Sequence, residues 1–300
     1  MATTVSGINE TLVDERVQSA FRFALPMLSV FSFGISAEEK IVDDVVYVPI
    51  ATDPSSAAKT AGTFGTSQGT LAGTSVTLST FRSASWDFKE GEVGARVFEN
   101  AWADKVAGAV YVLAKYGVDL ALALVTAANY GSGENDVLTV APADFGPNDL
   151  GQLWTKGAKK IKQRQKAVFL NADYGGSLLG ESTLATIFSN SGNNFMASGV
   201  VPQLLGMPSF IYPDFPANSE GCGGMVVGGA AIGIGIAPPS QLIASGEGDV
   251  VERRMVVDAD TGATFQLTTK VDAGGMVSGE LASLMGAAKL QDGIVRLVNG

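Results

Sequence analysis

A chain of 300 residues with 46% hydrophobic content is long enough to bury a sizeable core, in one large domain or in two lobes. Its net charge of −10 argues against a protein whose main function is to bind nucleic acid, because phosphate binding needs a positively charged surface. The absence of histidine excludes Ser-His-Asp and Cys-His catalysis, and the single cysteine, Cys222, excludes intrachain disulfides and multi-cysteine zinc sites.

Catalytic and nucleotide-binding motifs are also missing. Catalysis by carboxylate, lysine or tyrosine side chains is still possible, but the spacing of these residues does not single out any catalytic pair. The glycine-rich stretches "GCGGMVV" and "GIGIAPP" do not have the G-x-G-x-x-G spacing, and no Gly-Lys-Ser/Thr sequence is present. We therefore predict a protein that is not an enzyme, with no cofactor and no metal site.

The first 39 residues are predicted to form an arm. They combine a short amphipathic segment with a break at Pro26 and an aromatic patch at Phe31 and Phe33. Acidic residues stand where a secretory signal carries positive charge, so we expect cytoplasmic synthesis without export. The uncharged stretch that follows Gly221 contains too many glycines and prolines for a membrane-spanning helix, and a buried strand is the better interpretation.

Residues 41–88 are predicted to form a long β-hairpin. Its second strand places Val76, Leu78, Ala84, Trp86 and Phe88 on one face with a period of two. The polar, glycine-rich tip has nothing of its own to bury, and a two-stranded hairpin is marginally stable alone. The hairpin is therefore expected to lie on a neighbouring surface, and the alternative is a flexible surface loop.

A long helix is predicted for residues 97–127. Its apolar positions recur at spacings of three and four, as in an amphipathic helix: Phe98, Trp102, Val106, Ala109, Leu113, Tyr116, Leu120 and Leu124. At 1.5 Å per residue this helix would be roughly 45 Å long. Its apolar stripe is interpreted as core.

A second helix is expected after the N-cap candidates Asn148 and Asp149. The predicted helix is "LGQLWTKGAKKIKQRQ", followed by the strand "KAVFLN". We expect the helix to concentrate the basic side chains of residues 156–166, namely Lys156, Lys159, Lys160, Lys162, Arg164 and Lys166. Three interpretations remain open for this cluster: a solvated helical face, a contact with acidic patches on adjoining subunits, or a contact with nucleic acid.

The last third of the chain is predicted to consist mainly of strands. An apolar ribbon with Pro202, Pro208 and Pro213 leads into a glycine-rich apolar strand. A β-hairpin is expected over residues 249–275, a short helix or turn at "SGELASLMGA", and a closing strand at "IVRLV". No linker separates independent domains, so the lobes are expected to be interleaved in sequence.

This order of elements, with "LLGMPSFIYPDFP" and the glycine-rich strand after it, resembles the major capsid proteins of tailed bacteriophages, whose fold is shared with encapsulins. The resemblance covers nearly the whole chain and implies an α+β capsid fold. It divides the chain into an N-terminal arm (1–39), an extended β-hairpin loop (40–90), a peripheral domain with a spine helix and long strands (91–140 and 245–280) and an α/β axial domain (141–244 and 281–300).

The resemblance also implies a function. The chain would self-assemble as pentamers and hexamers into an icosahedral shell around double-stranded DNA, without sequence-specific binding. It would be assembled in the host bacterial cytoplasm, reside in the virion capsid, involve no membrane, and work with a portal, a separate scaffolding protein and, in some particles, a decoration protein. Residues predicted to contact neighbouring subunits are Phe31, Phe33, Lys59, Phe64, Trp86, Lys159, Lys160, Pro202, Pro208 and Pro213.

Some members of this family crosslink subunits between a lysine of the extended loop and an asparagine of a neighbour. Lys59 is the only lysine of the hairpin, and Asn299 is the only asparagine after Asn218, so the pattern matches badly and noncovalent maturation is expected. Two other functions stay open. An encapsulin-type compartment would hold protein cargo, and an enzyme or adhesin would need a reactive site or an export signal that the sequence does not display.

Overall fold

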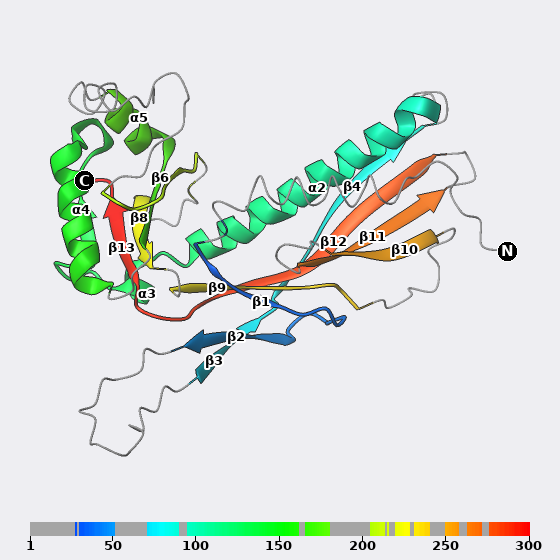
Figure 1. Ribbon diagram of the computed structural model, residues 1–300, viewed down its shortest axis with the longest axis horizontal. Coiled ribbons are helices and arrows are strands. Elements are labelled where there is room, and N and C mark those ends of the chain that lie inside the picture. The colour runs from blue at the N-terminus through cyan, green and yellow to red at the C-terminus, as the bar shows by residue number, and fades with distance from the viewer. Residues whose placement is uncertain are drawn as a thin grey trace, which may run out of the picture. The chain divides into compact units, whose positions relative to one another are not determined.

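The computed structural model (Figure 1) describes residues 28, 30–51, 71–89, 95–161, 166–180, 205–213, 215, 220–228, 231–240, 250–257, 263–271 and 276–300. The chain folds into two compact units that are interleaved in sequence, as the absence of a linker predicts. Among the described residues, unit 1 contains those within 33–109 and 233–290, and unit 2 contains those within 28–32, 110–232 and 291–300. Together the described residues make a mixed α+β fold.

Unit 1 is built on a six-stranded sheet. Its strand order is β1-β9-β12-β11-β10, and β4 pairs with β12 (Figure 1). The hairpin predicted over residues 249–275 is confirmed by the antiparallel pairing of β10 with β11. The strands are β1 (Ser32–Ile35), β4 (Thr80–Phe88), β9 (Ile232–Ala237), β10 (Val250–Val257), β11 (Thr264–Val271) and β12 (Val277–Lys289).

The predicted long helix is present as α2 (Ala95–Ala123). Its 29 residues correspond to about 43 Å at 1.5 Å per residue. In unit 1 its first turns pack on β4, where Trp102 meets Trp86 edge to face at a centroid distance of 5.3 Å. Phe88 and Phe98 complete this aromatic cluster, with a centroid distance of 5.6 Å between them. The apolar side of α2 therefore packs in the core, as the spacing of its apolar residues predicts.

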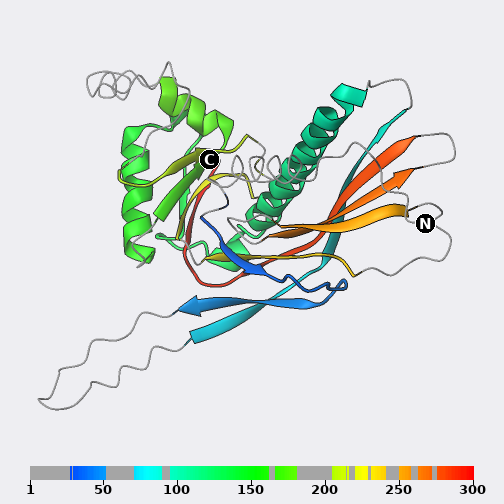
Figure 2. The ribbon, with the colours of Figure 1, turned by 45° about the vertical axis from the view of Figure 1, so that its right-hand side comes forward.

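The predicted hairpin divides into two parts. Only β2 (Val45–Ala51) and β3 (Leu71–Thr77) pair with each other, as an antiparallel ribbon (Figure 2). After Leu78 and Ser79 the chain joins the large sheet, where Phe81 lies opposite Leu284 and Phe88 opposite Val277. The alternation in residues 76–88 correctly predicts which side chains of these strands are buried or partly buried, but it does not indicate which strand each of them pairs with.

The inner face of the ribbon β2–β3 packs within unit 1. Val46 and Leu78 form a buried cluster with Ala237 and Leu284, and Val76 is fully buried. This packing explains how a two-stranded ribbon is stable, because a two-stranded hairpin alone buries too little apolar surface. The predicted tip of the hairpin lies outside the described residues.

The segment "SGELASLMGA", expected as a helix or turn, is instead the middle of β12. Its apolar residues Leu281, Leu284 and Met285 are spaced by three and four, a spacing that is typical of a helix. In the structure both faces of the strand are covered, so nearly every residue from Gly279 to Gly286 is buried. Alternation, the usual signal of a strand, is absent from a strand buried on both faces.

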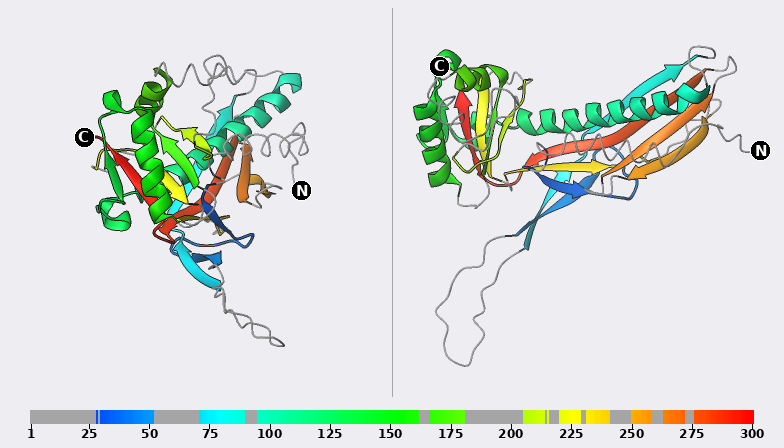
Figure 3. Two further views of the ribbon diagram at one scale, coloured as in Figure 1. Left: turned by 60° about the vertical axis from the view of Figure 1, so that its left-hand side comes forward. Right: turned by 45° about the horizontal axis from the view of Figure 1, so that its top comes forward.

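Unit 2 is a five-stranded sheet with the order β5-β13-β8-β6-β7, covered on one face by α4 (Figure 3). The predicted strands "KAVFLN" and "IVRLV" are present as β6 and β13. The elements are α3 (Ala127–Tyr130), β5 (Val137–Thr139), a 3-10 turn (Pro142–Asp144), α4 (Pro147–Lys160), β6 (Lys166–Leu170), α5 (Ala172–Gly180), β7 (Ser209–Ile211), β8 (Cys222–Gly228) and β13 (Ile294–Val298).

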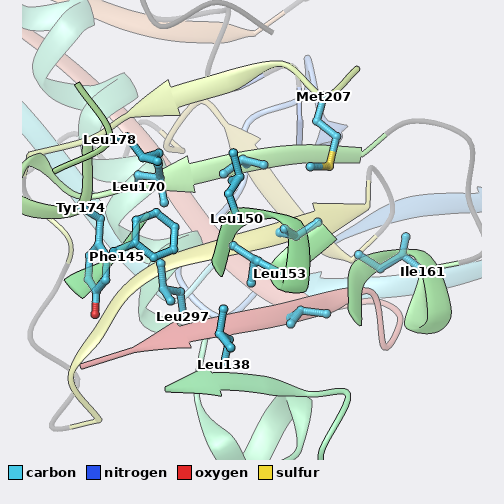
Figure 4. Packing of buried hydrophobic residues seen from close by; sticks show 13 residues of the cluster. Leu138, Phe145, Leu150, Leu153, Ile161, Leu170, Tyr174, Leu178, Met207 and Leu297 are labelled. Carbon is cyan, nitrogen blue, oxygen red and sulfur yellow. The ribbon is translucent and has the colours of Figure 1, made fainter. Parts of the chain in front are cut away.

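The core of unit 2 lies between α4 and this sheet (Figure 4). Leu150 and Leu153 of α4 pack with Leu170 of β6 and Leu297 of β13. The N-cap residue is Gly146, two residues before the first predicted cap, and its N–H donates to Asp149 Oδ2 at 3.1 Å. Asp149 thus acts as the reciprocal partner of the cap, and its negative charge suits the start of a helix.

The glycine-rich stretch predicted as one strand forms two strands, β8 in the middle of the unit 2 sheet and β9 in the unit 1 sheet. A Cβ at Gly223 would lie 2.3 Å from the ring of Tyr174, so only glycine fits beneath this aromatic side chain. The Tyr174 hydroxyl donates to the carbonyl of Val140 at 2.6 Å, which fixes the ring. The glycine at this position therefore serves close packing inside unit 2.

One described helix, Asn100–Ala123, is long and apolar enough to cross a membrane by those criteria alone. Half of its most apolar window is buried within the protein, which is the situation of a core helix. Trp102, Val110 and Leu113 are buried almost completely, and they pack against protein.

The boundaries of the predicted capsid domains remain a prediction. Residues 277–289 form one strand, which runs through the boundary predicted at 280/281. Residues 233–237, predicted as part of the axial domain, pair into the unit 1 sheet as part of β9.

The aromatic cluster of unit 1 predicts a large stability effect. Trp102→Ala removes a fully buried ring and should destabilise the protein by about 3–5 kcal/mol. Thermal and urea unfolding monitored by circular dichroism would measure the loss. Tyr111→Ala is the matched control, because Tyr111 is 49% exposed on the same helix and should change stability by less than about 0.5 kcal/mol. Equal effects of the two variants would contradict the assignment of Trp102 to the core.

Candidate functional site

The predicted contact residues are distributed over several parts of the structure and do not form one site. Lys59, Phe64 and Pro202 lie outside the described residues. Phe33 is half-buried in β1. Contacts of these four residues with a neighbouring subunit remain a prediction.

Phe31 and Trp86 are buried within their own units, in contrast to the exposed contacts that we expected. Phe31 is 4% exposed and packs on Phe169 at a ring-centroid distance of 5.6 Å. Trp86 is 8% exposed and packs on Trp102. Both aromatic side chains fill their own core, so their rings are not available to a partner subunit.

The basic cluster is also divided by the structure. The helix α4 ends at Lys160. Two of the basic residues, Lys162 and Arg164, lie outside the described residues, and Lys166 is the first residue of β6. Lys159 is exposed on α4, whereas the side chain of Lys160 is only 8% exposed. Lys160 therefore contributes little charge to the outer surface of the helix.

Pro208 and Pro213 are exposed and flank the three-residue edge strand β7. A short strand that is bounded by prolines offers little free backbone to another strand. These prolines therefore protect the edge of the unit 2 sheet, and their contact with neighbouring subunits stays a prediction.

Lys160 is the centre of a polar network in unit 2. Its Nζ lies 2.7 Å from Asp136 Oδ1 and 3.0 Å from Asp292 Oδ1. The same group donates to the carbonyl of Tyr130 at 2.6 Å. The ammonium thus connects the C-terminal end of α4 to the turns that precede β5 and β13.

Arg296 forms the second half of this network. It lies in β13, is 3% exposed, and pairs through Nη1 with the carboxylate of Glu220. Its Nη2 donates to the carbonyl of Gly131 at 2.8 Å. Glu220 also accepts from the backbone N–H of Ala127 at 2.6 Å, so this ion pair holds the first residue of α3.

The turn after α3 depends on glycine at position 131. Gly131 has a φ of +85°, which side chains other than glycine rarely adopt, and an added Cβ would lie 2.3 Å from Asp136 Oδ2. Asp136 also accepts from the N–H of Gly133 at 3.0 Å. The turn is therefore shaped around a carboxylate that Lys160 neutralises.

The sequence analysis did not find this polar network, because its members are separated by up to 165 residues. One signal was present: Arg296 interrupts the otherwise apolar strand "IVRLV". A cation within a buried strand requires a carboxylate partner. The sequence could not identify that partner among thirty acidic residues.

In the described part of the chain, burial keeps one thiol and two phenols in their neutral forms. Burial raises the pKa of the Cys222 thiol to about 11, so the thiol is un-ionised at neutral pH and a poor nucleophile. Burial likewise raises the pKa of Tyr174 to about 12 and that of Tyr130 further. Within the described residues no group of three or more Cys, Asp or Glu side chains is placed to hold a metal ion.

Several large apolar side chains are exposed on regular elements of the described chain. In unit 1 four of them lie within residues 41–47, and the others are Phe81 on β4 and Met255 and Val257 on β10. Tyr47 is the most exposed of them, at 69%. In unit 2 Trp154 on the outer surface of α4 is 40% exposed. These surfaces are the candidate functional sites, because apolar surface of this kind favours association.

Comparisons with known proteins identify the fold. No protein-family model and no curated sequence matches the chain. Among solved structures, the capsid of Ralstonia phage GP4 aligns with a TM-score of 0.52 and 10% identity over 89% of this chain and 86% of that chain. The capsid of the cyanophage P-SCSP1u aligns with a TM-score of 0.50 and 12% identity, over 91% and 88%. A virus-like particle from Pyrococcus furiosus aligns with a TM-score of 0.49 and 11% identity, over 94% and 98%.

The resemblance that the sequence suggested is confirmed at the level of the fold. The chain has the fold of these phage capsid proteins, over nearly its whole length. At such low identity the likeness shows the fold alone.

The network around Lys160 predicts a difference between two adjacent lysines. Lys160→Met leaves Asp136 and the carbonyl of Tyr130 without this donor and should destabilise the protein by about 1–3 kcal/mol. Lys159→Met is the control, because Lys159 is exposed, and should change stability by less than about 0.5 kcal/mol. Urea unfolding at neutral pH distinguishes the two, and equal stability of both variants would show that Lys160 is not an anchor.

The same network predicts a pH dependence. The hydrogen bond from Lys160 lowers the pKa of Asp136 below its ordinary value. A carboxyl whose pKa is lower in the folded state stabilises the fold above its unfolded pKa, about 3.9, and loses this contribution as the pH falls through the folded pKa. The stability of the wild type should therefore decrease more steeply below about pH 4 than that of Lys160→Met. Parallel stability profiles for the two proteins, measured by urea unfolding between pH 2 and pH 7, would argue against this contribution.

Proposed function

We propose that the chain is a structural capsid protein whose copies associate into a closed icosahedral shell of pentamers and hexamers around double-stranded DNA. The strongest support for this proposal is that the fold is similar to two phage capsid structures, over 89% and 91% of this chain. No catalytic function is proposed, because the solved structures that share this fold are those of phage capsids.

The surface of the protein supports association between copies. The outer face of the ribbon β2–β3 carries exposed Val45 and Tyr47, while the inner face is packed within unit 1. A shell protein gains from such a surface, because contacts between identical copies can close into rings. An acidic chain can still enclose DNA, since the closed wall confines the genome and counterions screen its charge.

The proposal includes partners that the family resemblance implies. The chain would act with itself, with a portal, with a separate scaffolding protein and with a decoration protein where one is used. Assembly would take place in the host bacterial cytoplasm, and the assembled protein would belong to the virion capsid. Lys159, Pro208 and Pro213 are exposed and remain proposed contacts between subunits.

Negative-stain electron microscopy of the purified chain, together with size-exclusion chromatography, tests the proposal. Closed shells, five- or six-membered rings, or tubes are expected. Nuclease-protected DNA in particles from infected cells would separate a capsid from an encapsulin-type compartment, which would contain protein cargo. A chain that stays monomeric at high concentration and with crowding agents would contradict self-assembly of this chain alone.

The exposed ribbon gives a second prediction. Tyr47→Ser should change the stability of the subunit by less than about 0.5 kcal/mol, because the ring is 69% exposed. It should nevertheless lower the yield of shells, since an exposed tyrosine on a ribbon is suited to a contact between subunits. Tyr111→Ser, on an exposed position of α2, is the control for an aromatic residue outside the ribbon. Normal shell yield from Tyr47→Ser would exclude the ribbon's outer face as a contact.

A further inference from the structure

The turn that leads into β2 presents an apolar corner on a fixed backbone. The N–H of Asp44 donates to the carbonyl of Ile41 at 3.1 Å, and the N–H of Ile41 donates to Asp44 Oδ2 at 3.1 Å. Two further backbone hydrogen bonds join the turn to Leu78. The N–H of Asp43 donates to the carbonyl of Leu78 at 3.0 Å, and the N–H of Leu78 donates to the carbonyl of Asp44 at 2.8 Å. Its conformation is therefore set within unit 1 before any partner binds.

The segment before this turn is fixed as well. The N–H of Lys40 donates to the carbonyl of Pro238 at 2.9 Å, and the N–H of Ser240 donates to the carbonyl of Lys40 at 2.7 Å. Glu38 N–H donates to the Ser36 hydroxyl at 3.2 Å. Backbone that is already ordered loses little conformational entropy when a partner binds, which favours a contact at this place.

The side chains on this backbone are unusual for a turn. Ile41 is 55% exposed, Val42 is 48% exposed and Val45 is 40% exposed. Turns commonly carry polar residues or glycine, and exposed apolar patches with a polar rim mark interaction surfaces. We call these three residues the apolar corner.

The rim of the apolar corner is acidic. Glu38, Glu39 and Asp43 are exposed around it, and the side chain of Glu38 is 87% exposed. The one cation of the segment, Lys40, lies 3.9 Å from Glu38 and offsets only part of this charge. A partner surface for the corner should therefore combine apolar area with positive charge.

The outer face of α4 has that combination. Trp154, Thr155, Ala158 and Lys159 are all exposed, and their spacing of three and four places them on one side of the helix. Trp154 is 40% exposed, and tryptophan is among the residues that contribute most to binding at interfaces. Lys160 belongs to the internal network, so Lys159 supplies the cation at the C-terminal end of this face.

We propose that the apolar corner of one subunit docks on the outer face of α4 of a second copy, with Glu38 facing Lys159 and Ile41 and Val42 facing Trp154 and Ala158. This inference rests on the proposed self-assembly and names two surfaces that would meet. Burial of the apolar side chains supplies most of the driving force. The exposed charges set the register, because like charges that face each other across an interface weaken the contact.

A charge exchange tests the proposed register. Glu38→Lys and Lys159→Glu, each alone, should raise the protein concentration needed for assembly by about tenfold, and the double variant should restore it towards the wild-type value. Lys105→Glu, an exposed charge reversal on α2, is the control and should have no effect. Light scattering during assembly and the fraction of protein in particles are the readouts.

A crosslink tests the proximity of the two surfaces directly. Chains with Val42→Cys are mixed with chains that carry Ala158→Cys, assembled and oxidised, and a disulfide-linked dimer is expected on a non-reducing gel, since the Cα atoms of a disulfide lie within about 7 Å. Native Cys222 is buried and does not compete. Val42→Cys mixed with Val112→Cys, exposed on α2, is the control and should give no dimer.

The outcomes separate this inference from the proposed function. If the wild type forms shells but the crosslink is absent and the charge exchange is not compensated, the docking is wrong and the shell function stands. If Lys159→Glu changes only the nucleic-acid content of particles, α4 faces the genome and the inference is overturned. If the wild type forms no assembly, the proposed function fails, and the crosslink in concentrated chain mixtures still decides whether the two surfaces meet.

Discussion

Two enclosed cations, Lys160 and Arg296, determine how the rest of unit 2 is built. A buried ammonium or guanidinium requires carboxylates and carbonyls around it, because an unpaired buried charge is severely destabilising. Asp136 and Glu220 supply the carboxylates, and Tyr130 and Gly131 supply the carbonyls. The end of α4, the start of α3 and strand β13 are thereby held together, and the apolar core between α4 and the sheet is closed at this end.

This network also changes the functional interpretation of the basic cluster. A row of lysines in a sequence suggests a charged surface, but Lys160 neutralises the subunit's own carboxylates. The outer face of α4 then has one exposed lysine and an exposed tryptophan in its described part. The described part of this helix surface therefore carries less free positive charge than the sequence suggests.

Local patterns in the sequence predicted the elements that depend on one periodicity. The spacing in residues 98–124 predicted α2, and the alternation at Val76, Leu78 and Trp86 predicted the buried side of β3 and β4. The pairing partner of β4 could not be predicted, because β4 presents the same pattern whether it pairs with β2 or with β12. The strand β12 was missed because it is buried on both faces, and the polar network was missed because its contacts join residues far apart in the chain. The exposed apolar corner was also missed, since Ile41 and Val42 look like the start of a strand.

The central claim is that this capsid fold assembles with copies of itself. Electron cryomicroscopy of the purified chain after assembly tests it most directly. The account predicts a closed shell whose wall is made of repeated subunits with this fold. A homogeneous preparation of monomers, under conditions of concentration and crowding that drive assembly of shell proteins, would contradict it.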